Sequence, residues 1–582
     1  MILAAWDPGG VHLARTWAGG LGAVRTDRDE LNHPVLARSA GAGESHFVAG
    51  DVMIVAQGAR AEDVALAYRR HGILCPRTLS GDFGFALYDS RLRRLIATSS
   101  ITSHRPLAYW LDARRALIAS SVLALLRHPH VPRALDEVYV AHLVFGLQSM
   151  ESGSTPLSGI RRLRAGEALI VADGEPNVVQ VDHLRPRHSP RGEGRRISTF
   201  WEQLEAVVTR DAATRPAPCL SLSGGLDSTA IAAALLRDGR PIDAFALAAP
   251  ELGSDRETRT LSILEHEWPQ LRLRRIHCAD AHEYPDLDEF PLRDDPQLVP
   301  LSMLPARLRL WTAAHRAGFY TILDGEGGDE LFEGLQSPLD AFRRRRWLPL
   351  LRHLRARPDR RSVVWQRVLL PVLGARARRT LRSKGIQADA HLPAFAEWRA
   401  GEHPAVRIAL EQRLARQVRG SKYDLIHDWL SSPMTVGTAL SHDHLASAVG
   451  VRRTSPLLER EIIELVLGLP PEDTLSAGTP KPFLRAALAS RIPDEVRTAV
   501  KDVHLAAELS PRIVSSTRAR RLLADTRVRE RLAGWLRFEK VDAMQDAAAT
   551  GQLRSYEPLW ALECLLTFAD WYARASREYG VQ

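Results

Sequence analysis

The sequence is poor in lysine and cysteine, and it contains no long apolar run. Five of its 78 basic residues are lysines, which leaves 78 − 5 = 73 arginines, and we attribute this skew to a coding bias that favours arginine codons. A lysine that remains is therefore a candidate for a role that needs a compact ammonium group rather than a guanidinium fork. The five are Lys384, Lys422, Lys481, Lys501 and Lys540.

The few cysteines exclude two classes of protein. They are scattered without any C-x-x-C spacing, so neither a zinc cluster nor a disulfide framework is indicated, and a reducing cytoplasm fits best. The N-terminus lacks the pattern of a secretory signal, and no window approaches the ~18 apolar residues of a membrane span. We therefore expect a cytoplasmic protein without a membrane span. The cysteines are Cys75, Cys219, Cys278 and Cys564.

The 582 residues are 45% hydrophobic and 25% charged, which is the composition of folded globular domains. Residues 1–184 form short alternating β-type runs separated by turn residues and predict a β-rich domain. Residues 185–198, rich in proline, glycine and charge, are predicted to be a linker. Residues 199–582 form the second domain, which is predicted to be helical from about residue 337.

The second domain alternates helices with short apolar strands up to residue 323. This alternation predicts a parallel sheet covered on both faces, so the expected fold class is α/β with an N-terminal β-rich sandwich. The basic segment 343–384 interrupts the later helical pattern, and we favour a solvated helical face or loop over an anion or peptide site. The expected strands are 219–222, 242–247, 273–277 and 320–323, and the expected helices are 199–210, 227–237, one that opens at Ser254 with Glu257 as a capping box, and 301–317.

A loop rich in glycine and hydroxyl groups connects the strand 219–222 to the helix 227–237. Two glycines let the backbone approach a ligand, and the N–H groups that open the helix favour an anion. We predict a phosphate-binding loop; a plain βα turn is the alternative. The predicted loop lacks the lysine of the G-x-x-x-x-G-K-[ST] loop. Its residues are Ser221, Leu222, Ser223, Gly224, Gly225, Leu226, Asp227, Ser228 and Thr229.

An acidic, glycine-rich loop, 324–332, follows the strand 320–323. Loops after the carboxyl ends of parallel strands share one edge of the sheet, so we expect this loop to face the phosphate-binding loop. Asp227 and Asp329 would then hold Mg²⁺, which binds one or two carboxylates plus phosphate oxygens. A loop that caps a helix is the alternative for Asp329, but it leaves the three glycines unexplained.

The strings SLSGGLDST and DGEGGDELF, in this order, resemble the synthetase domain of the asparagine synthetase family, in which the first string is the PP-loop of N-type ATP pyrophosphatases. Other segments resemble the same family. They are 454–459, where Glu459 replaces the usual Asp, 481–485 and 491–501 in the synthetase half, and 81–87, 104–107 and 119–120 in a glutaminase-type (Ntn) N-terminal domain.

The resemblance implies that the protein uses ATP and Mg²⁺ to adenylate a carboxylate, with release of AMP and pyrophosphate. It places Leu247 and Gly325 at the nucleotide, together with the PP-loop. It places Lys501 against the phosphates, where an ammonium could stabilise charge at the α-phosphate; a surface lysine is the alternative. Glu326 matches a position beside the acyl group, where it could accept a proton from the attacking amine or orient it.

The chain departs from the family at the glutaminase nucleophile. A glutamine-hydrolysing member has a cysteine directly after the initiator methionine, where this chain has Ile2, so we expect no glutamine hydrolysis and a nitrogen that arrives on the substrate. Two branches lack the cysteine: β-lactam synthetases, which have a tyrosine at the position of Glu326, and lasso peptide cyclases. We predict a macrolactam synthetase that joins an Asp or Glu side chain of a precursor peptide to the peptide's N-terminal amine.

Other functions stay open at this stage. They are a β-lactam-synthetase-like or asparagine-synthetase-like enzyme that takes a small substrate or free ammonia, and an inactive nucleotide-binding homologue. The pI of about 9.6 would suit a nucleic-acid binder, but the charge is spread along the chain without an RNA-binding signature, so we expect no nucleic-acid partner. The expected partners are the precursor peptide, a companion leader peptidase and a leader-binding protein.

Overall fold

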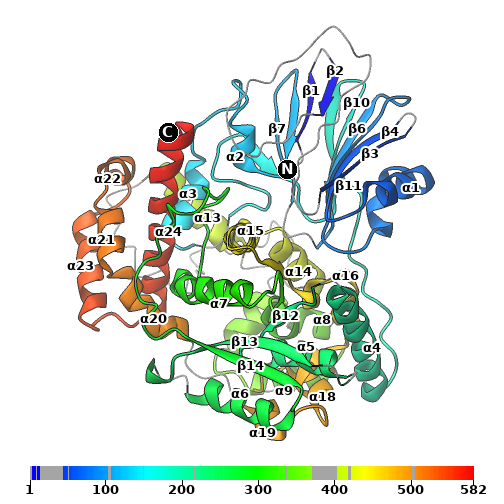
Figure 1. Ribbon diagram of the computed structural model, residues 1–582, viewed down its shortest axis with the longest axis vertical. Coiled ribbons are helices and arrows are strands. Elements are labelled where there is room, and N and C mark those ends of the chain that lie inside the picture. Colours follow the sequence, from blue (N-terminus) through cyan, green and yellow to red (C-terminus); the bar gives the residue numbers. More distant parts are fainter. Residues whose placement is uncertain are drawn as a thin grey trace.

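The structure is a computed structural model of the chain, in which a β domain lies against an α/β domain and the C-terminal helices flank both (Figure 1). It describes residues 3–7, 10–13, 44–49, 52–102, 106–147, 150–213, 216–237, 239, 241–252, 255–334, 337–369, 372, 403–416, 421–476, 478–499 and 505–582.

The N-terminal domain contains two antiparallel sheets. Their strand orders are β11-β10-β6-β5-β4-β3 and β2-β1-β8-β7-β9. The β-type runs expected near residues 83–88 and 95–97 form a hairpin in which Leu87 pairs with Ile96. The strands are β1 (Leu3–Asp7), β2 (Gly10–Leu13), β3 (Glu44–Ala49), β4 (Val52–Gln57), β5 (Gly84–Asp89), β6 (Arg94–Ser99), β7 (Ala108–Leu111), β8 (Ala116–Ala119), β9 (Ile160–Arg162), β10 (Glu167–Ala172) and β11 (Glu175–Gln180).

Apolar side chains hold the two sheets face to face. Ala97 and Leu169 of the six-stranded sheet share a buried cluster with Ile118 of the five-stranded sheet. Phe85 points to the opposite side of its sheet, into a second cluster under the first helix. The predicted Ntn-like sandwich is therefore confirmed. Its helical segments are α1 (Ala61–His71), η1 (Gly72–Thr78), α2 (Val122–Leu125) and α3 (Glu137–Val144).

Helix α4 (Glu193–Ala212) begins inside the segment 185–198, whose composition predicts a linker. Its first turn is anchored because the guanidinium of Arg196 pairs with Asp473, with 2.9 Å between Nη2 and Oδ1. Leu184, just before the segment, is buried in the core of the second domain. The connection is thus fixed to that domain by contacts that its polar sequence hides.

The second domain contains a five-stranded sheet in which every pair is parallel, in the order β14-β13-β12-β15-β16. Four of its strands are those expected from the sequence. The fifth, β16, was missed because its residues are two arginines and a threonine, which give no apolar run. The strands are β12 (Cys219–Ser221), β13 (Ile242–Ala248), β14 (Leu271–His277), β15 (Thr321–Leu323) and β16 (Arg452–Thr454).

Helices make up most of the described chain beyond residue 337, as expected, and no helix in the described ranges is long and apolar enough to cross a bilayer. The helical segments of this domain are α5 (Leu226–Leu236), η2 (Pro250–Leu252), α6 (Asp255–Glu267), η3 (Leu301–Met303), α7 (Leu304–Arg316), η4 (Glu330–Gly334), α8 (Pro338–Arg343), α9 (Trp347–Arg355), α10 (Arg360–Val364), η5 (Trp365–Leu369), α13 (Pro404–Arg416), α14 (Lys422–Leu430), α15 (Pro433–Ala448), η7 (Pro456–Leu458), α16 (Arg460–Gly468), α17 (Pro471–Thr474), α18 (Pro482–Leu488), α19 (Asp494–Thr498), α20 (Leu505–Val514), α21 (Thr517–Leu523), α22 (Thr526–Leu532), α23 (Phe538–Ala549) and α24 (Tyr556–Tyr579).

The inner strands β12 and β13 of the parallel sheet are largely buried on both faces. Successive residues of its strands point to opposite sides, so Cys219 and Phe245 join an apolar cluster with α7, whereas Leu220 and Ala244 join a cluster with α4 and α5. Burial on both faces explains why β12 and most of β13 appear in the sequence as apolar runs.

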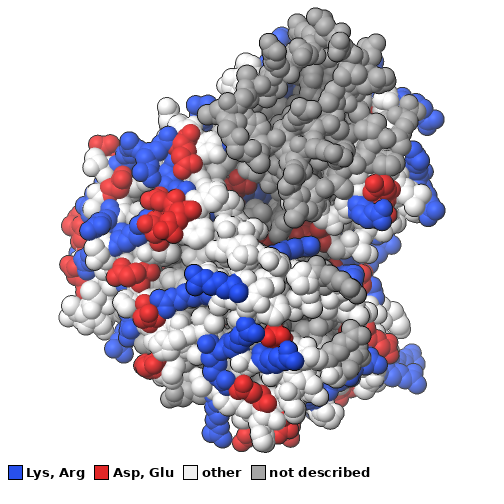
Figure 2. Space-filling view, viewed as in Figure 1, with Lys and Arg blue, Asp and Glu red and all other residues white. Residues whose placement is uncertain are grey.

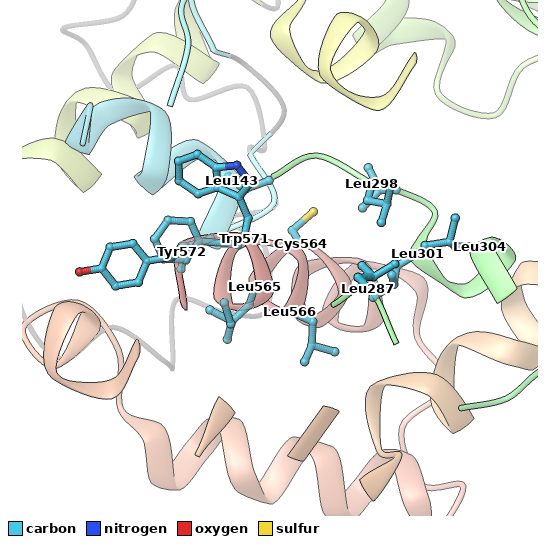
Figure 3. Close-up of a cluster of buried hydrophobic side chains, with 14 of the residues drawn as sticks. Leu143, Leu287, Leu298, Leu301, Leu304, Cys564, Leu565, Leu566, Trp571 and Tyr572 are labelled. Atoms are coloured by element: carbon cyan, nitrogen blue, oxygen red, sulfur yellow. The ribbon is translucent and has the colours of Figure 1, made fainter. Parts of the chain in front are cut away.

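The long helix α24 lies in the middle of the largest apolar cluster (Figure 3). Its Leu565 and Trp571 share that cluster with Leu143 of the β domain and with Leu298 and Leu301, which precede α7. This helix therefore connects the N-terminal domain to the segment that leads into the cleft described next.

Candidate active site

A cleft opens at the carboxyl edge of the parallel sheet, where β12, β13 and β15 end. Its volume is about 850 Å³, within the range of roughly 300–1,000 Å³ that is common for small-molecule sites. The loop after β12, the loop after β15 and Leu247 near the end of β13 line it. Both predicted loops therefore face the same space.

The phosphate-binding loop is shaped by its own hydroxyl groups. The Ser223 N–H donates to Ser228 Oγ at 3.1 Å, and the Gly225 N–H donates to Ser223 Oγ at 3.2 Å. Gly224 has a φ of +75°, which glycine adopts without strain. Gly225 caps α5, so the first turn of the helix, whose N–H groups have no partner within the helix itself, and the positive end of the helix dipole lie at the cleft. A loop of this shape is suited to an anion.

Two of the predicted nucleotide residues lie behind this loop. Leu222 and Thr229 have no exposed surface, and the Leu222 N–H donates to the Phe245 carbonyl at 2.9 Å. Their side chains contribute packing. The other predicted residues line the cleft: Ser221, Ser223, Gly224, Gly225, Leu226, Asp227, Ser228, Leu247 and Gly325.

The acidic loop after β15 packs directly on the phosphate-binding loop. A Cβ at Gly325 would lie 2.8 Å from the nitrogen of Ser228, and a Cβ at Gly328 would overlap the carboxyl group of Asp227. Gly327 has a φ of +87°. The close approach of the two loops therefore explains Gly325 and Gly328, whereas Gly327 is explained by its positive φ and by Leu458, which a Cβ there would overlap.

Lys481 bridges the two predicted metal ligands. Its ammonium group contacts Asp227 Oδ2 and lies 2.6 Å from Asp329 Oδ1. Burial lowers the pKa of Lys481, but the charges of the two carboxylates outweigh burial and raise this pKa above its ordinary value. The residue has a left-handed backbone, with a φ of 53°, at the N-cap of α18. Such strain in a non-glycine residue is frequent at functional sites.

The two carboxylates fit Mg²⁺ when phosphate oxygens complete the coordination. Asp227 and Asp329 converge on one positive charge, which the Lys481 ammonium supplies in this structure. Among the described residues, no group of three or more His, Cys, Asp or Glu side chains could hold a metal ion. A pair of carboxylates is what Mg²⁺ takes from the protein when a nucleotide supplies the remaining ligands.

Glu326 is held in an ion-pair network at the cleft wall. The buried Arg453 contacts Glu326 and lies 2.9 Å from Asp324 and 3.2 Å from Asp443. Burial alone would lower the pKa of Arg453, but the three carboxylates raise it, so the guanidinium stays charged. Glu326 is fixed in place and still has 30% of its side chain exposed.

Sequence reasoning missed Lys481 and Arg453 as site residues. Lys481 could have been found, since it is one of five lysines and lies in the family-like segment 481–485, but nothing distinguishes Arg453 among 73 arginines. Lys501 and Ile2 lie outside the described residues, so the roles expected for them stay predictions.

Beyond Glu326 the cleft continues between α7 and α15. We call this part the acyl chamber. Its walls are mainly apolar, and its lining includes Val299, Met303, Arg307, Leu310, Trp311, Met434, Thr438, His442 and Trp560.

Fold and cleft together define an α/β protein with a phosphate-binding loop on a parallel sheet, preceded by an Ntn-like sandwich. A family model for asparagine synthase matches residues 199–573, more than half of the chain, and a model for a glutamine amidotransferase domain matches residues 56–180. The chain belongs to the asparagine synthase family.

Its curated relatives are distant. Asparagine synthetase [glutamine-hydrolyzing] 3 of Bacillus subtilis is 27% identical over 160 residues, which are 27% of this chain and 26% of that protein. Amidase chyE of Penicillium rubens is 26% identical over 48% of this chain and 43% of its own length. A putative asparagine synthetase of Mycobacterium tuberculosis is 26% identical over 75% of this chain and 68% of its own length. The chain thus spans less than half of the first two relatives.

Among solved structures, the glutamine phosphoribosylpyrophosphate amidotransferase of B. subtilis aligns with 40% of this chain and 63% of its own, at 11% identity and a TM-score of 0.16.

Proposed function

We propose that the protein is an AMP-forming, ATP-dependent amide ligase that acts as a macrolactam synthetase. It would adenylate an Asp or Glu side chain of a precursor peptide and join it to the peptide's N-terminal amine. The observation that carries this proposal is the convergence of the phosphate-binding loop, Asp227, Asp329 and Lys481 on one cleft, without a Walker-type lysine.

The residues of the cleft have distinct roles in this proposal. The loop amides would hold the phosphates, and Asp227 and Asp329 would hold Mg²⁺, which supplies charge neutralisation at the phosphates. Lys481, like Lys501 from its family-like position, would place an ammonium near the charge that develops on adenylation. Glu326 would accept a proton from the attacking amine or orient that amine.

The amine is proposed to arrive on the substrate because the chain offers no thiol for glutamine hydrolysis. All four cysteines are buried. Burial raises the pKa of Cys75 and Cys219 to about 12 and that of Cys278 to about 11, and it raises the pKa of Cys564 well above its ordinary value. A thiol must ionise to act as a nucleophile, so none of these four is suited to that role.

The interface between the domains is packed where Arg162 meets the second domain. Arg162 of the β domain is ion-paired with Asp295, and both side chains are buried; Tyr139 donates to the same carboxylate at 3.1 Å. The pocket between the domains next to Arg162 holds about 10 Å³, roughly the space of one water. A packed polar network therefore stands at the domain boundary near the cleft.

A peptidic substrate is favoured by the acyl chamber. Its apolar lining, with Trp311 and Trp560, suits hydrophobic side chains of a peptide better than ammonia or a small polar amino acid. Incubation of the purified protein with a candidate precursor peptide, ATP and Mg²⁺ tests the proposal. A product one water lighter than the peptide is expected, together with AMP and pyrophosphate.

Two alternatives predict different outcomes. An asparagine-synthetase-like or β-lactam-synthetase-like enzyme would consume free ammonia or cyclise a small amino acid, and it would leave the peptide unchanged. An inactive homologue would bind ATP without forming pyrophosphate. Release of glutamate from glutamine by homogeneous protein would contradict the proposed source of nitrogen.

A further inference from the structure

The acyl chamber carries one positive charge that the reaction proposed above does not use. One face of α7 presents Arg307, Leu310 and Trp311, and one face of α15 presents Thr438 and His442. The spacings of three and four residues place each set on a single side of its helix. The two helices are in contact and are neighbours in Figure 1.

Arg307 lies on the wall of the cleft without a counter-ion. Its Nη1 donates to His442 Nδ1 at 3.0 Å, and within the described part of the chain no carboxylate lies at ion-pair distance from it. Glu326 and Asp324 act on Arg307 at longer range, but both are bonded to Arg453. A partly buried guanidinium whose hydrogen-bond partner is a neutral ring and not a carboxylate is costly in an apolar setting, which points to an anionic ligand.

His442 orients Arg307 and leaves its charge in place. It is 1% exposed, and burial, followed by the charge of Arg307, holds the pKa of His442 well below its ordinary range. The ring is therefore neutral at pH 7, and one of its nitrogens can accept the hydrogen bond from Arg307. The Trp311 ring packs edge-on against this imidazole, with 6.1 Å between centroids.

We propose that Arg307 receives a carboxylate of the substrate other than the one that is adenylated. The substrate would then be an acid with at least two carboxylates on an apolar body, such as a peptide with a second acidic side chain or a free C-terminus near the reacting residue. A guanidinium fork matches a carboxylate with two parallel hydrogen bonds, and Leu310 and Trp311 beside it suit the apolar body.

This subsite is separate from the phosphate end of the cleft. The charged groups that act on Arg307 are Arg453, Glu326 and Asp324, whereas Lys481 interacts with Asp227 and Asp329. Arg307 therefore interacts with the charges around Glu326 and not with those of the proposed metal ligands. The subsite rests on the proposed function, because it is defined relative to the carboxylate that is adenylated. Binding of the second carboxylate can still be measured separately from adenylation.

Two matched probes test the subsite: N-acetyl-aspartyl-phenylalanine and the same dipeptide with a C-terminal amide. They share one side-chain carboxylate and one apolar ring, and they differ in the second carboxylate. Equilibrium binding is followed by the fluorescence of the cleft tryptophans with a non-hydrolysable ATP analogue and Mg²⁺ present. Adenylation is followed in parallel by ATP–pyrophosphate exchange.

The wild-type protein should bind the acid about tenfold to a hundredfold more tightly than the amide, as expected for hydrogen bonds between charged groups. Arg307→Gln should weaken binding of the acid to the level of the amide and leave the amide unchanged, and Arg307→Lys should retain part of the preference. Arg309→Gln is the matched control, because Arg309 lies on the exposed side of the same helix and pairs with Asp280.

Three results would overturn the subsite: no binding of the acid by the wild type, equal binding of acid and amide, or equal losses for both probes in Arg307→Gln. If Arg307→Gln lowers the melting temperature, Arg307→Lys decides by the same comparison. A preference for the acid without any pyrophosphate exchange would support the subsite and contradict the proposed adenylation. ATP–pyrophosphate exchange without a preference for the acid would support the proposed adenylation and contradict the subsite.

Discussion

Asp227 and Asp329 come from different loops and reach the same ammonium group, that of Lys481. An ammonium group is compact enough to lie between the two carboxylates. The broader guanidinium, which this chain uses for most of its positive charges, would separate them. Lys481 and Asp227 are 254 residues apart, so this arrangement exists only in the folded chain.

Asp227→Asn or Asp329→Asn should abolish turnover and leave the fold intact. Each change removes a carboxylate from the proposed Mg²⁺ site at almost constant side-chain volume. The measurement is pyrophosphate release, with the melting temperature as a check of folding. Asp280→Asn, on the exposed surface, serves as the control. A rate near that of the wild type in either cleft variant would remove that residue from the metal site.

Lys481→Gln should lower the rate of pyrophosphate release on the order of 10²-fold, which is the loss typical of one preorganised electrostatic group. Lys501→Ala should cause a similar loss if Lys501 holds its family-like position. Lys501→Arg should also lose much of the rate, because a guanidinium does not fit the same point. Lys540→Gln, at an exposed position of α23, is the control. Single-turnover kinetics would separate chemistry from ATP affinity; a pure loss of affinity would argue against a role in the adenylation step.

At the scale of elements, the loops meet because they follow neighbouring strands of one parallel sheet. Strands β12 and β15 pair in parallel, so their carboxyl ends deliver the phosphate-binding loop and the acidic loop to the same edge. The glycines of the acidic loop then allow it to lie against the first turn of α5.

Gly328→Ala should therefore disrupt the site more than an alanine elsewhere. Its Cβ would overlap the Asp227 carboxyl group, so the acidic loop must move away and separate the two carboxylates. Gly534→Ala is a matched control, since a Cβ there meets nothing within 4 Å. Mg²⁺-dependent ATP binding, measured by calorimetry, should weaken in Gly328→Ala and stay unchanged in Gly534→Ala. Equal affinities in the two variants would contradict the close approach of the loops.

Most elements around the cleft could be predicted from the sequence because their patterns are local. β13 and α5 follow from apolar runs and spacing, and the phosphate-binding loop follows from its glycines and hydroxyl groups. β16 could not be predicted, since an edge strand of two arginines and a threonine has no apolar run. Neither could the contacts of Lys481 and Arg453, which depend on tertiary packing between distant segments.

At the scale of the whole molecule, the N-terminal domain braces the cleft. Arg162 of that domain pairs with the fully buried Asp295, in the segment that leads to the wall of the acyl chamber, and α24 packs against the same segment (Figure 3). On the face shown in Figure 2, basic and acidic residues lie interspersed over the described part of the surface. Exposed ion pairs of the described chain, such as Arg259 with Glu495, contribute little to stability.

Arg162→Met should lower the free energy of unfolding by about 3–5 kcal/mol, because it leaves the Asp295 carboxylate buried without its partner. Arg161→Gln, on the same strand, removes the exposed pair with Glu151 and should cost less than about 1 kcal/mol. Denaturant unfolding of both variants checks the difference. Similar losses in the two proteins would show that the buried pair does not lock the domains together.

The central claim is that this cleft adenylates a carboxylate, and the products of ATP test it most directly. Phosphorus NMR of the protein with ATP, Mg²⁺ and a candidate precursor peptide should show AMP and pyrophosphate in equal amounts. Mass spectrometry of the same sample should show one peptide lighter by one water for each AMP. ADP and phosphate as the stoichiometric products would contradict the account.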